Sequence, residues 1–390
     1  MPINNNRSQR FFYLLLMLFD VKRKITHELF KTPIVQQTAF WSIVKQKVGQ
    51  QSIALNFKTW KSSIYSNVIS DSAITSDILV ILHPVNQHDF IAYIPYGPEL
   101  DPENEFRGIF LEELSECIRP FLPKNCFMIR YDLCWDVFWA NDPAFFDSDG
   151  NCIENPSVKA QEVRFNINTH YWNLQKSESN LLPTHTLYLN LQPNSETILK
   201  KMKPKTRYNI RLSHRKGVTV RTANLNDLPV WRHLYTETAI RNGIQLNNLN
   251  YFEAILSTNA DESKSPAEVI YLIAEVEKKP LAAMFLVVSG HRGSYLYGAS
   301  SGNSRNFMAS YALQWEAINI AKKRGCIEYD MFGIAPNNNS SHPLYGLYKF
   351  KTGFGGEMFH SLGCWDYPFD QKKYTLYKST ELTSQGFHIN

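Results

Sequence analysis

The stretch of sequence that decides the fold is residues 281–330, LAAMFLVVSGHRGSYLYGASSGNSRNFMASYALQWEAINIAKKRGCIEYD. Two strand-like segments, 281–288 and 294–298, flank a polar turn and predict a hairpin. Apolar residues at helical spacing then predict a helix over 308–321, and residues 326–330 predict a short strand. A hairpin, a crossover helix and a returning strand are expected to form a mixed sheet with a helix packed against it.

The same order of elements occurs earlier in the chain. Residues 77–96 predict a hairpin, residues 102–121 a helix and residues 126–132 a strand. Matched positions in the two stretches are offset by nearly the same number of residues. These positions are Tyr96 with Tyr297 (201 residues), Cys126 with Cys326 (200 residues) and Asp132 with Asp330 (198 residues). The nearly constant offset indicates a duplicated module.

The chain has 390 residues, more than one compact core usually serves, so two domains are expected. Residues 141–183 lie between the two modules and are rich in Asn, Asp, Ser and Pro, which favours a linker or a long surface excursion. The sequence therefore predicts an α/β (α+β) protein with an N-terminal extension at residues 1–30, a first domain at 31–180 and a second domain at 181–355.

Charge and composition exclude several classes of protein. The chain has 41 Lys and Arg against 36 Asp and Glu, an excess too small to make the whole surface a polyanion binder. We therefore expect no DNA partner, and any anion site must come from local clustering. The 24 Phe and 20 Tyr exclude a disordered chain. The six cysteines show no zinc-ligand spacing, so free thiols in a reducing compartment and no metal are expected.

The apolar run at residues 11–19 lies between Arg7 and Arg10 on one side and the basic cluster 22–24 on the other, as in a signal peptide. It is too short to span a bilayer, and no small-residue cleavage site follows it. Three interpretations stay open: a short interfacial helix, an ordinary packed helix, or residues upstream of the true start. The expected location is the cytoplasm, with peripheral contact at the inner face of the membrane as an open alternative.

A basic helix is predicted near the start of the second module, where Pro204 suits the first helical turn and Gly217 the end. Residues 200–216 carry eight Lys or Arg and no Asp or Glu. The candidates for phosphate binding are Lys205, Arg207, Arg211 and Arg215. The three arginines are four residues apart and share one face. A solvated helix face is the alternative, and the phosphate could belong to tRNA or to a nucleotide-sugar.

Duplicated modules of this order resemble the GNAT-like acyltransferase fold that binds acetyl-CoA. In that fold two glycines of a Q/R-x-x-G-x-G/A loop let backbone N–H groups approach the pyrophosphate. The matching stretch here, residues 305–310, has Met308 and Ser310 at both glycine positions. Residues 98–103 of the first module show no such pattern. We therefore expect the fold without the coenzyme, and no cofactor.

Taken in order, six segments between residues 38 and 377 resemble the Fem family of non-ribosomal peptidoglycan aminoacyltransferases. They are YIPYGP (93–98), KTRYNIR (205–211), RNG (241–243), YGAS (297–300), YDMFG (329–333) and FKTGFG (350–355). The resemblance implies two GNAT-like domains, with residues 356–390 returning to the first, and a precursor cleft between the domains or on the first. Only residues 244–257 occupy the place where several members insert a helical arm, so this is a short form.

The activity that the resemblance implies uses aminoacyl-tRNA as the donor. An amine of the stem peptide of UDP-MurNAc-pentapeptide or lipid II attacks the ester carbonyl, and positioning with oxyanion stabilisation supplies most of the catalysis. The amine must first lose a proton, for which Asp132 is the candidate base. A turn-capping role for Asp132 is the alternative. By the same resemblance Lys351 stabilises charge on the carbonyl or on the leaving tRNA oxygen.

The resemblance also gives candidates for holding the precursor. Arg241 would contact phosphate, Tyr297 would contact the precursor with its hydroxyl or ring, and Tyr96 lies in the first matching segment. Trp41 and Lys45 are further candidates in a predicted first helix, although a Trp there is more often part of the core.

Two rival functions stay open. A CoA-dependent N-acyltransferase with a degenerate phosphate loop would have to bind CoA past Met308. A non-catalytic RNA-binding module would use the basic helix and leave Lys351 and the duplicated fold without a purpose.

Overall fold

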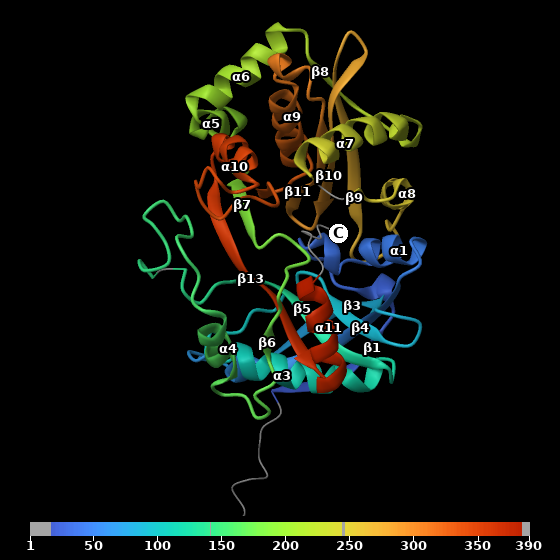
Figure 1. The fold of residues 1–390 in the computed structure, drawn as a ribbon, viewed down its shortest axis with the longest axis vertical. Helices are drawn as coiled ribbons and strands as arrows, with labels where there is room; N and C mark the ends of the chain where they lie inside the picture. The colour runs from blue at the N-terminus through green and yellow to red at the C-terminus, as the bar shows by residue number, and fades with distance from the viewer. Residues whose placement is uncertain (1–16, 141, 244–245, 384–390) are drawn as a thin grey trace, which may run out of the picture.

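The computed structural model describes residues 17–140, 142–243 and 246–383 (Figure 1). One mixed sheet runs through both halves in the order β1-β2-β3-β4-β5-β13-β7-β12-β11-β10-β9-β8, and β6 pairs with β13 beside this path. Helices cover the faces of the sheet, as expected of a GNAT-like α/β fold. Among the described residues, no helix has both the length and the apolar character needed to cross a bilayer.

The first half contains the strands β1 to β5. They are β1 (Leu18–Lys24), β2 (Gln51–Trp60), β3 (Ala73–Pro84), β4 (Phe90–Ile94) and β5 (Cys126–Asp136). Its helices are α1 (Ala39–Lys47), α2 (Lys61–Ile64) and α3 (Arg107–Ile118), and α4 (Val158–Asn166) and β6 (Gln175–Lys176) follow before the second half.

The second half begins at β7. Its strands are β7 (His185–Asn190), β8 (Thr219–Thr222), β9 (Ala267–Val276), β10 (Lys279–Ser289), β11 (Arg292–Ser300) and β12 (Glu328–Asp330). Its helices are α5 (Ser195–Lys201), α6 (Pro204–Arg215), α7 (Leu228–Asn242), α8 (Leu249–Ser257), α9 (Ala309–Lys323) and α10 (Tyr345–Lys351). The chain closes with β13 (Glu357–Pro368) and α11 (Gln371–Thr383).

The predicted duplication is visible in the strand pairing. In the first half β3 and β4 pair antiparallel, and β5 returns parallel to β4 after α3. In the second half β10 and β11 pair antiparallel, and β12 returns parallel to β11 after α9. Each half therefore repeats a hairpin, a crossover helix and a parallel strand, which confirms the repeated module.

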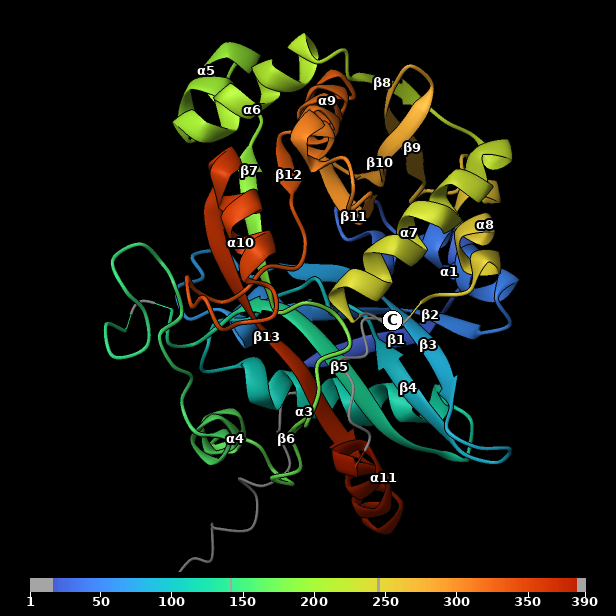
Figure 2. The same cartoon turned by 45° about the horizontal axis from the view of Figure 1, so that its top comes forward.

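Strand β13 joins the two halves, and in both views it passes from the upper lobe into the lower one (Figures 1 and 2). Its first part pairs with β7 and its later part pairs with β5. The helix that follows packs Tyr374 against Ile91 and Met128 of the first half. The end of the described chain thus belongs to the first half, while the start of β13 completes the second.

Neither of the two helical interpretations of residues 11–19 holds for the part that the structure describes. Leu18 and Phe19 begin β1, which pairs antiparallel with β2 at the edge of the sheet, and residues 1–16 lie outside the described chain. Strand β1 buries Leu18 and exposes Lys22 and Arg23, and charged side chains of this kind are common on edge strands. Residues 18–24 are therefore part of the first sheet, and not of an extension ending at residue 30.

The segment at 141–183 is anchored more firmly than a linker or surface excursion. Phe165 of α4 is buried and stacks on Trp365 of β13, with ring centroids 4.0 Å apart. Downstream, β6 pairs with β13. The polar composition hid this packing, since a few apolar residues carry it. Residue 141 itself lies outside the described chain.

Three large cores hold the molecule together. One lies within the first half and one lies under α9 in the second. The third joins the halves, because Phe40 and Trp41 of α1 pack with Trp231 of α7 and Phe285 of β10. This shared core fixes the two halves against each other, and so fixes the site that lies between them.

Candidate functional site

The second half has a split in its sheet. Strands β11 and β12 pair only over Arg292–Ser294 and Glu328–Asp330, after which β11 continues to Ser300 while the other chain turns away. Lys351, the last residue of α10, reaches this split. Its Nζ donates to the carbonyl oxygens of Phe332 (3.0 Å) and Gly333 (2.6 Å) and lies 5.1 Å from the centre of the Tyr295 ring.

Burial changes the charge state of Lys351. The residue is 4% exposed, and burial lowers the pKa of its ammonium to about 7, although the neighbouring Asp330 opposes the decrease. Near neutral pH the group is therefore divided between a proton donor and a free amine. A buried cation of this kind interacts strongly with any negative charge that develops beside it.

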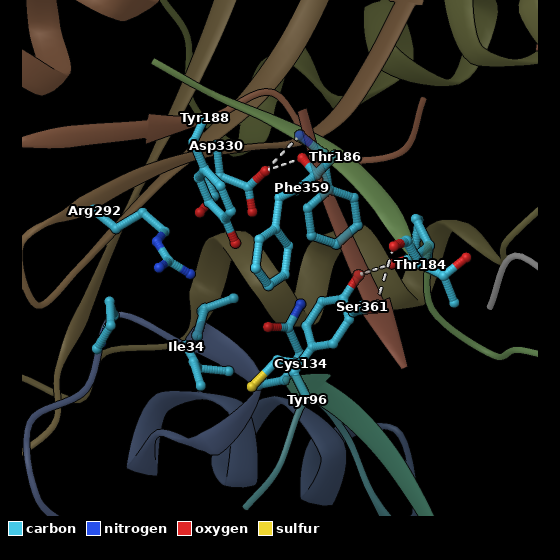
Figure 3. A pocket seen from close by; sticks show the side chains of 16 residues that line it. Ile34, Tyr96, Cys134, Thr184, Thr186, Tyr188, Arg292, Asp330, Phe359 and Ser361 are labelled. Atoms are coloured by element: carbon cyan, nitrogen blue, oxygen red, sulfur yellow. Dashed lines mark hydrogen bonds between the residues drawn. The ribbon is translucent and has the colours of Figure 1, made fainter. Parts of the chain in front are cut away.

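A narrow cavity lies between the two halves, next to the split (Figure 3). Arg292 and Asp330 reach into it from the second half, and Ile34, Cys134 and Tyr96 face them from the first (Figure 3). The cavity offers about 30 Å³ to water-sized groups.

Hydrogen bonds to neighbouring residues fix the positions of Asp330 and Arg292. One carboxylate oxygen of Asp330 accepts bonds from the Thr186 hydroxyl and, at 2.8 Å, from the Phe332 N–H. Burial raises the pKa of Asp330, and Arg292 and Thr186 oppose the rise. Arg292 donates from Nε to Glu328 at 2.7 Å, and its guanidinium lies 4.8 Å from the ring centre of Tyr188.

A cationic groove lies at the N-terminal end of α9. Its charged lining residues are Lys205, Arg241 and Arg305, and no Asp or Glu is among the residues that line it in the described chain. Arg241 donates to the Ser300 carbonyl at 2.9 Å, and burial together with the charge of Arg305 lowers its pKa. Three cations beside a helix N-terminus make this groove suitable for an anion.

Lys351 is buried and lines neither the groove nor the cavity, but its neighbours connect it to both. Its neighbour Phe350 lines the groove, whereas Phe332, whose carbonyl accepts the Lys351 bond, lines the cavity. A group bound in the groove and a group bound in the cavity could therefore meet beside one buried ammonium.

A third group of candidate residues lies where α1 meets the second half. The Lys45 ammonium is 5.2 Å from the Trp41 ring and 5.4 Å from the ring of Tyr251, and the Tyr251 hydroxyl lies 2.8 Å from that of Tyr297. Burial lowers the pKa of Lys45 to about 8. The structure thus brings Trp41, Lys45 and Tyr297 together. It adds Tyr251 of α8, which no sequence motif marks.

Asp132 is not among the residues that line the cavity. Its Oδ2 accepts from the Tyr93 hydroxyl at 3.0 Å and from the Leu182 N–H at 2.9 Å, and burial raises its pKa to about 6. Its counterpart in the second module, Asp330, lines the cavity instead. The offset of 198 residues between them could have marked Asp330 as a candidate.

Arg241 and Tyr96, the other two candidates for precursor binding, do not belong to the cluster around Lys45. Arg241 belongs to the groove, and not to the cluster that contains Tyr297. Tyr96 lines the cavity, donates to the Pro183 carbonyl at 2.7 Å and packs edge-on against Phe332. The candidates for precursor binding therefore lie at three separate positions.

The basic helix forms as α6, and its residues have different environments. Lys205 lines the groove. Arg207 donates from Nη1 to the carbonyls of Lys200 and Met202, which ties α6 to the end of α5. Arg211 and Arg215 are exposed. Of the three arginines predicted to share one face of α6, only Arg211 and Arg215 are exposed and free of the α5 contact.

Met308 precedes α9 with φ at 56°, a left-handed conformation that glycine adopts more readily. Its side chain lines the groove. Among the described residues, no group of three His, Cys, Asp or Glu could hold a metal ion.

The fold and site define a protein built from two repeated α/β modules that share one mixed sheet. The crystal structure of FemX is similar over 92% of this chain and 100% of that chain, with a TM-score of 0.67 and 15% sequence identity. The FemAB family profile matches residues 32–266 and 257–381. The chain therefore belongs to the FemAB family.

Two curated relatives are lipid II:glycine glycyltransferases. The protein of Staphylococcus epidermidis (strain ATCC 35984) is 23% identical over 259 residues, and that of Staphylococcus aureus (strain USA300) is 23% identical over 264 residues. Each match covers 51% of this chain and 62% of the relative. The chain thus matches a little under two thirds of the length of these relatives.

Proposed function

We propose that this protein is an aminoacyltransferase that moves an amino acid from aminoacyl-tRNA to a stem-peptide amine of a peptidoglycan precursor. Membership of the FemAB family and the names of the lipid II:glycine glycyltransferase relatives support this proposal. The observation that carries it is the position of Lys351, whose neighbours connect it to both a cationic groove and a polar cavity.

The groove is the proposed site of the tRNA acceptor end. Lys205, Arg241 and Arg305 would neutralise its phosphates, and the N-terminus of α9 adds a favourable dipole. Helix α6 contributes Lys205 to the groove and continues outward to the exposed Arg211 and Arg215. The RNA backbone would follow this surface.

The precursor is proposed to bind between the halves. The cluster of Trp41, Lys45, Tyr251 and Tyr297 offers a cation and aromatic rings to a sugar or phosphate. Either UDP-MurNAc-pentapeptide or lipid II carries such groups. If lipid II is the acceptor, the protein works in the cytoplasm at the inner face of the membrane.

The reaction forms a bond between the acceptor nitrogen and the ester carbonyl carbon and breaks the bond from that carbon to the tRNA 3′ oxygen. Negative charge appears on the carbonyl oxygen in the tetrahedral intermediate, and Lys351 is placed to stabilise it. The nitrogen gives up a proton, and the leaving oxygen gains one. Asp132 is enclosed by Tyr93 and Leu182, so its buried position does not favour the role of base.

The alternative, transfer from acetyl-CoA, is disfavoured by Met308. Its side chain lines the groove at the position where that fold uses a glycine. The test supplies labelled acceptor with charged tRNA or with acetyl-CoA. Ribonuclease treatment is expected to abolish transfer, whereas product made from acetyl-CoA without RNA would overturn the choice of donor.

A further inference from the structure

The cavity between the halves contains donors that no protein group satisfies. Gln36 is 3% exposed, and its Nε2 has no hydrogen-bond partner within the described chain. Arg292 uses Nε for Glu328, and among described residues its two Nη atoms donate to no other group. A buried donor without a partner costs free energy, so Gln36 indicates a ligand that supplies an acceptor, and the half-buried guanidinium of Arg292 has two Nη atoms free to bind the same ligand.

The same cavity also contains an acceptor. Thr186 and the Phe332 N–H occupy one carboxylate oxygen of Asp330, and the other oxygen bonds to nothing else in the described part of the chain. It faces the cavity (Figure 3). Arg292 is ion-paired with Glu328 and not with Asp330. A cation and an anion therefore face one space without forming a direct ion pair in the described chain.

The size of the space limits what can enter it. About 30 Å³ is accessible to water-sized groups, which is enough for one or two small charged groups and too little for a sugar or a base. An ammonium is small enough and would bind the carboxylate of Asp330. A carboxylate is also small enough and would accept from paired N–H donors.

We propose that the cavity binds the zwitterionic centre of an α-amino carboxylate, with the ammonium at Asp330 and the carboxylate at Arg292 and Gln36. This inference rests on the proposed function. It implies that the carbon bearing the acceptor amine also bears a carboxylate. The amine of a lysine side chain has no such carboxylate and leaves Arg292 and Gln36 unpaired.

The position of the cavity suits an acceptor. Phe332 lines it, and the Phe332 carbonyl accepts a bond from Lys351. An amine held at Asp330 therefore lies beside the split where the ester carbonyl of the donor is expected. The cavity fixes which amine is presented, and Lys351 acts on the carbonyl that this amine attacks.

The test uses two synthetic precursors that differ only at the third stem residue, which is lysine in one and diaminopimelic acid in the other. Equilibrium binding to the full chain is measured without tRNA. The wild type is expected to bind the diaminopimelic precursor at least about tenfold more tightly, because a charged contact is added. Gln36→Met and Asp330→Asn are each expected to remove most of this preference.

Glu357→Gln is the matched control, because it makes the same change of charge at an exposed position of β13 outside the cavity lining and should keep the preference. Gln36→Met removes an unpaired donor and is expected to leave thermal stability equal or higher, so it remains informative if Asp330→Asn unfolds. Equal affinity of the wild type for both precursors, or a preference that survives Gln36→Met, would overturn the inference. Binding without transfer would count against the proposed function alone.

Discussion

The ammonium of Lys351 is held by two carbonyl oxygens, and in the described chain no carboxylate lies within ion-pair distance of it. Carbonyl dipoles orient the group without neutralising it. In its protonated form Lys351 therefore keeps its charge available for an oxyanion, and the buried surroundings strengthen that interaction.

Replacing this charge gives the first prediction. Lys351→Met is expected to lower the single-turnover rate by about a hundred- to a thousandfold, since one donor to the oxyanion is lost. Precursor affinity should change little, because Met keeps the length of the buried stem. Lys349→Met is the matched control, because Lys349 is exposed on the same helix. A collapse of affinity with the saturated rate preserved would make Lys351 a binding residue.

The second prediction concerns pH. Burial lowers the pKa of Lys351 to about 7, so the ammonium is present below this pH and is lost above it. The rate of the chemical step should therefore have a limb that falls as pH rises through about 7, and this limb should be absent in Lys351→Met. A pH–rate profile of both proteins checks the expectation. A limb that persists in the variant would assign the titration to another group.

The same shift has a consequence for stability. Between pH 7 and 10.5 the unfolded chain binds more protons at Lys351 than the folded chain, so this group makes stability rise with pH over that window. Below pH 7 the folded state carries the full cost of burying the charge. Lys351→Met should thus gain stability relative to wild type most clearly at pH 6, and this gain should shrink by pH 9 in thermal unfolding scans.

At the scale of elements, α6 is the segment that carries the predicted RNA contact. Arg211→Ala is expected to reduce tRNA affinity and to lower the salt dependence of binding by about one charge. Arg232→Ala, an exposed arginine of α7 outside the groove lining, is the control. Binding measured over a range of salt concentrations tests the expectation, and an unchanged slope for Arg211→Ala would make α6 a solvated face.

Arg207 on the same helix should behave differently. Its guanidinium bonds the Lys200 and Met202 carbonyls at the end of α5, so Arg207→Ala is expected to cost about 1 kcal/mol of folding free energy. Denaturant unfolding measures this cost. A loss of tRNA affinity without any loss of stability would show that Arg207 contacts the RNA.

Elements with strong local signals could be predicted from the sequence. Pro204 and Gly217 bound α6, and apolar spacing over 308–321 predicts α9. Strand β1 could not be predicted, because its apolar first residues are equally compatible with a helix. Only its pairing with β2 makes it a strand. Tertiary packing overrides the local pattern where a segment is short.

At the scale of the whole molecule, the repeat predicts two similar halves but not how they meet. That depends on β13, which pairs with β5 and β7 and turns the halves into one sheet. The cavity needs Gln36 from the first half and Asp330 from the second, residues 294 positions apart in the sequence. No local pattern relates them, so the site could be predicted only residue by residue from the family resemblance.

The sequence predicts no location for Lys351, and the structure places it at the split between β11 and β12. Whether it acts in catalysis stays a prediction. The two modules use one pair of matching positions differently, because Asp132 bonds to Tyr93 and Leu182 while Asp330 lines the cavity. Arg241 lines the groove instead.

The most direct test of the central claim is the mass of the product. The purified chain is incubated with a pool of charged tRNA and either UDP-MurNAc-pentapeptide or lipid II, and the precursor is then measured by mass spectrometry. We predict a mass increase equal to one or more amino-acid residues, which disappears in Lys351→Met and after ribonuclease treatment. An unchanged mass with both precursors, or an increase equal to an acetyl group in the presence of acetyl-CoA, would contradict the account.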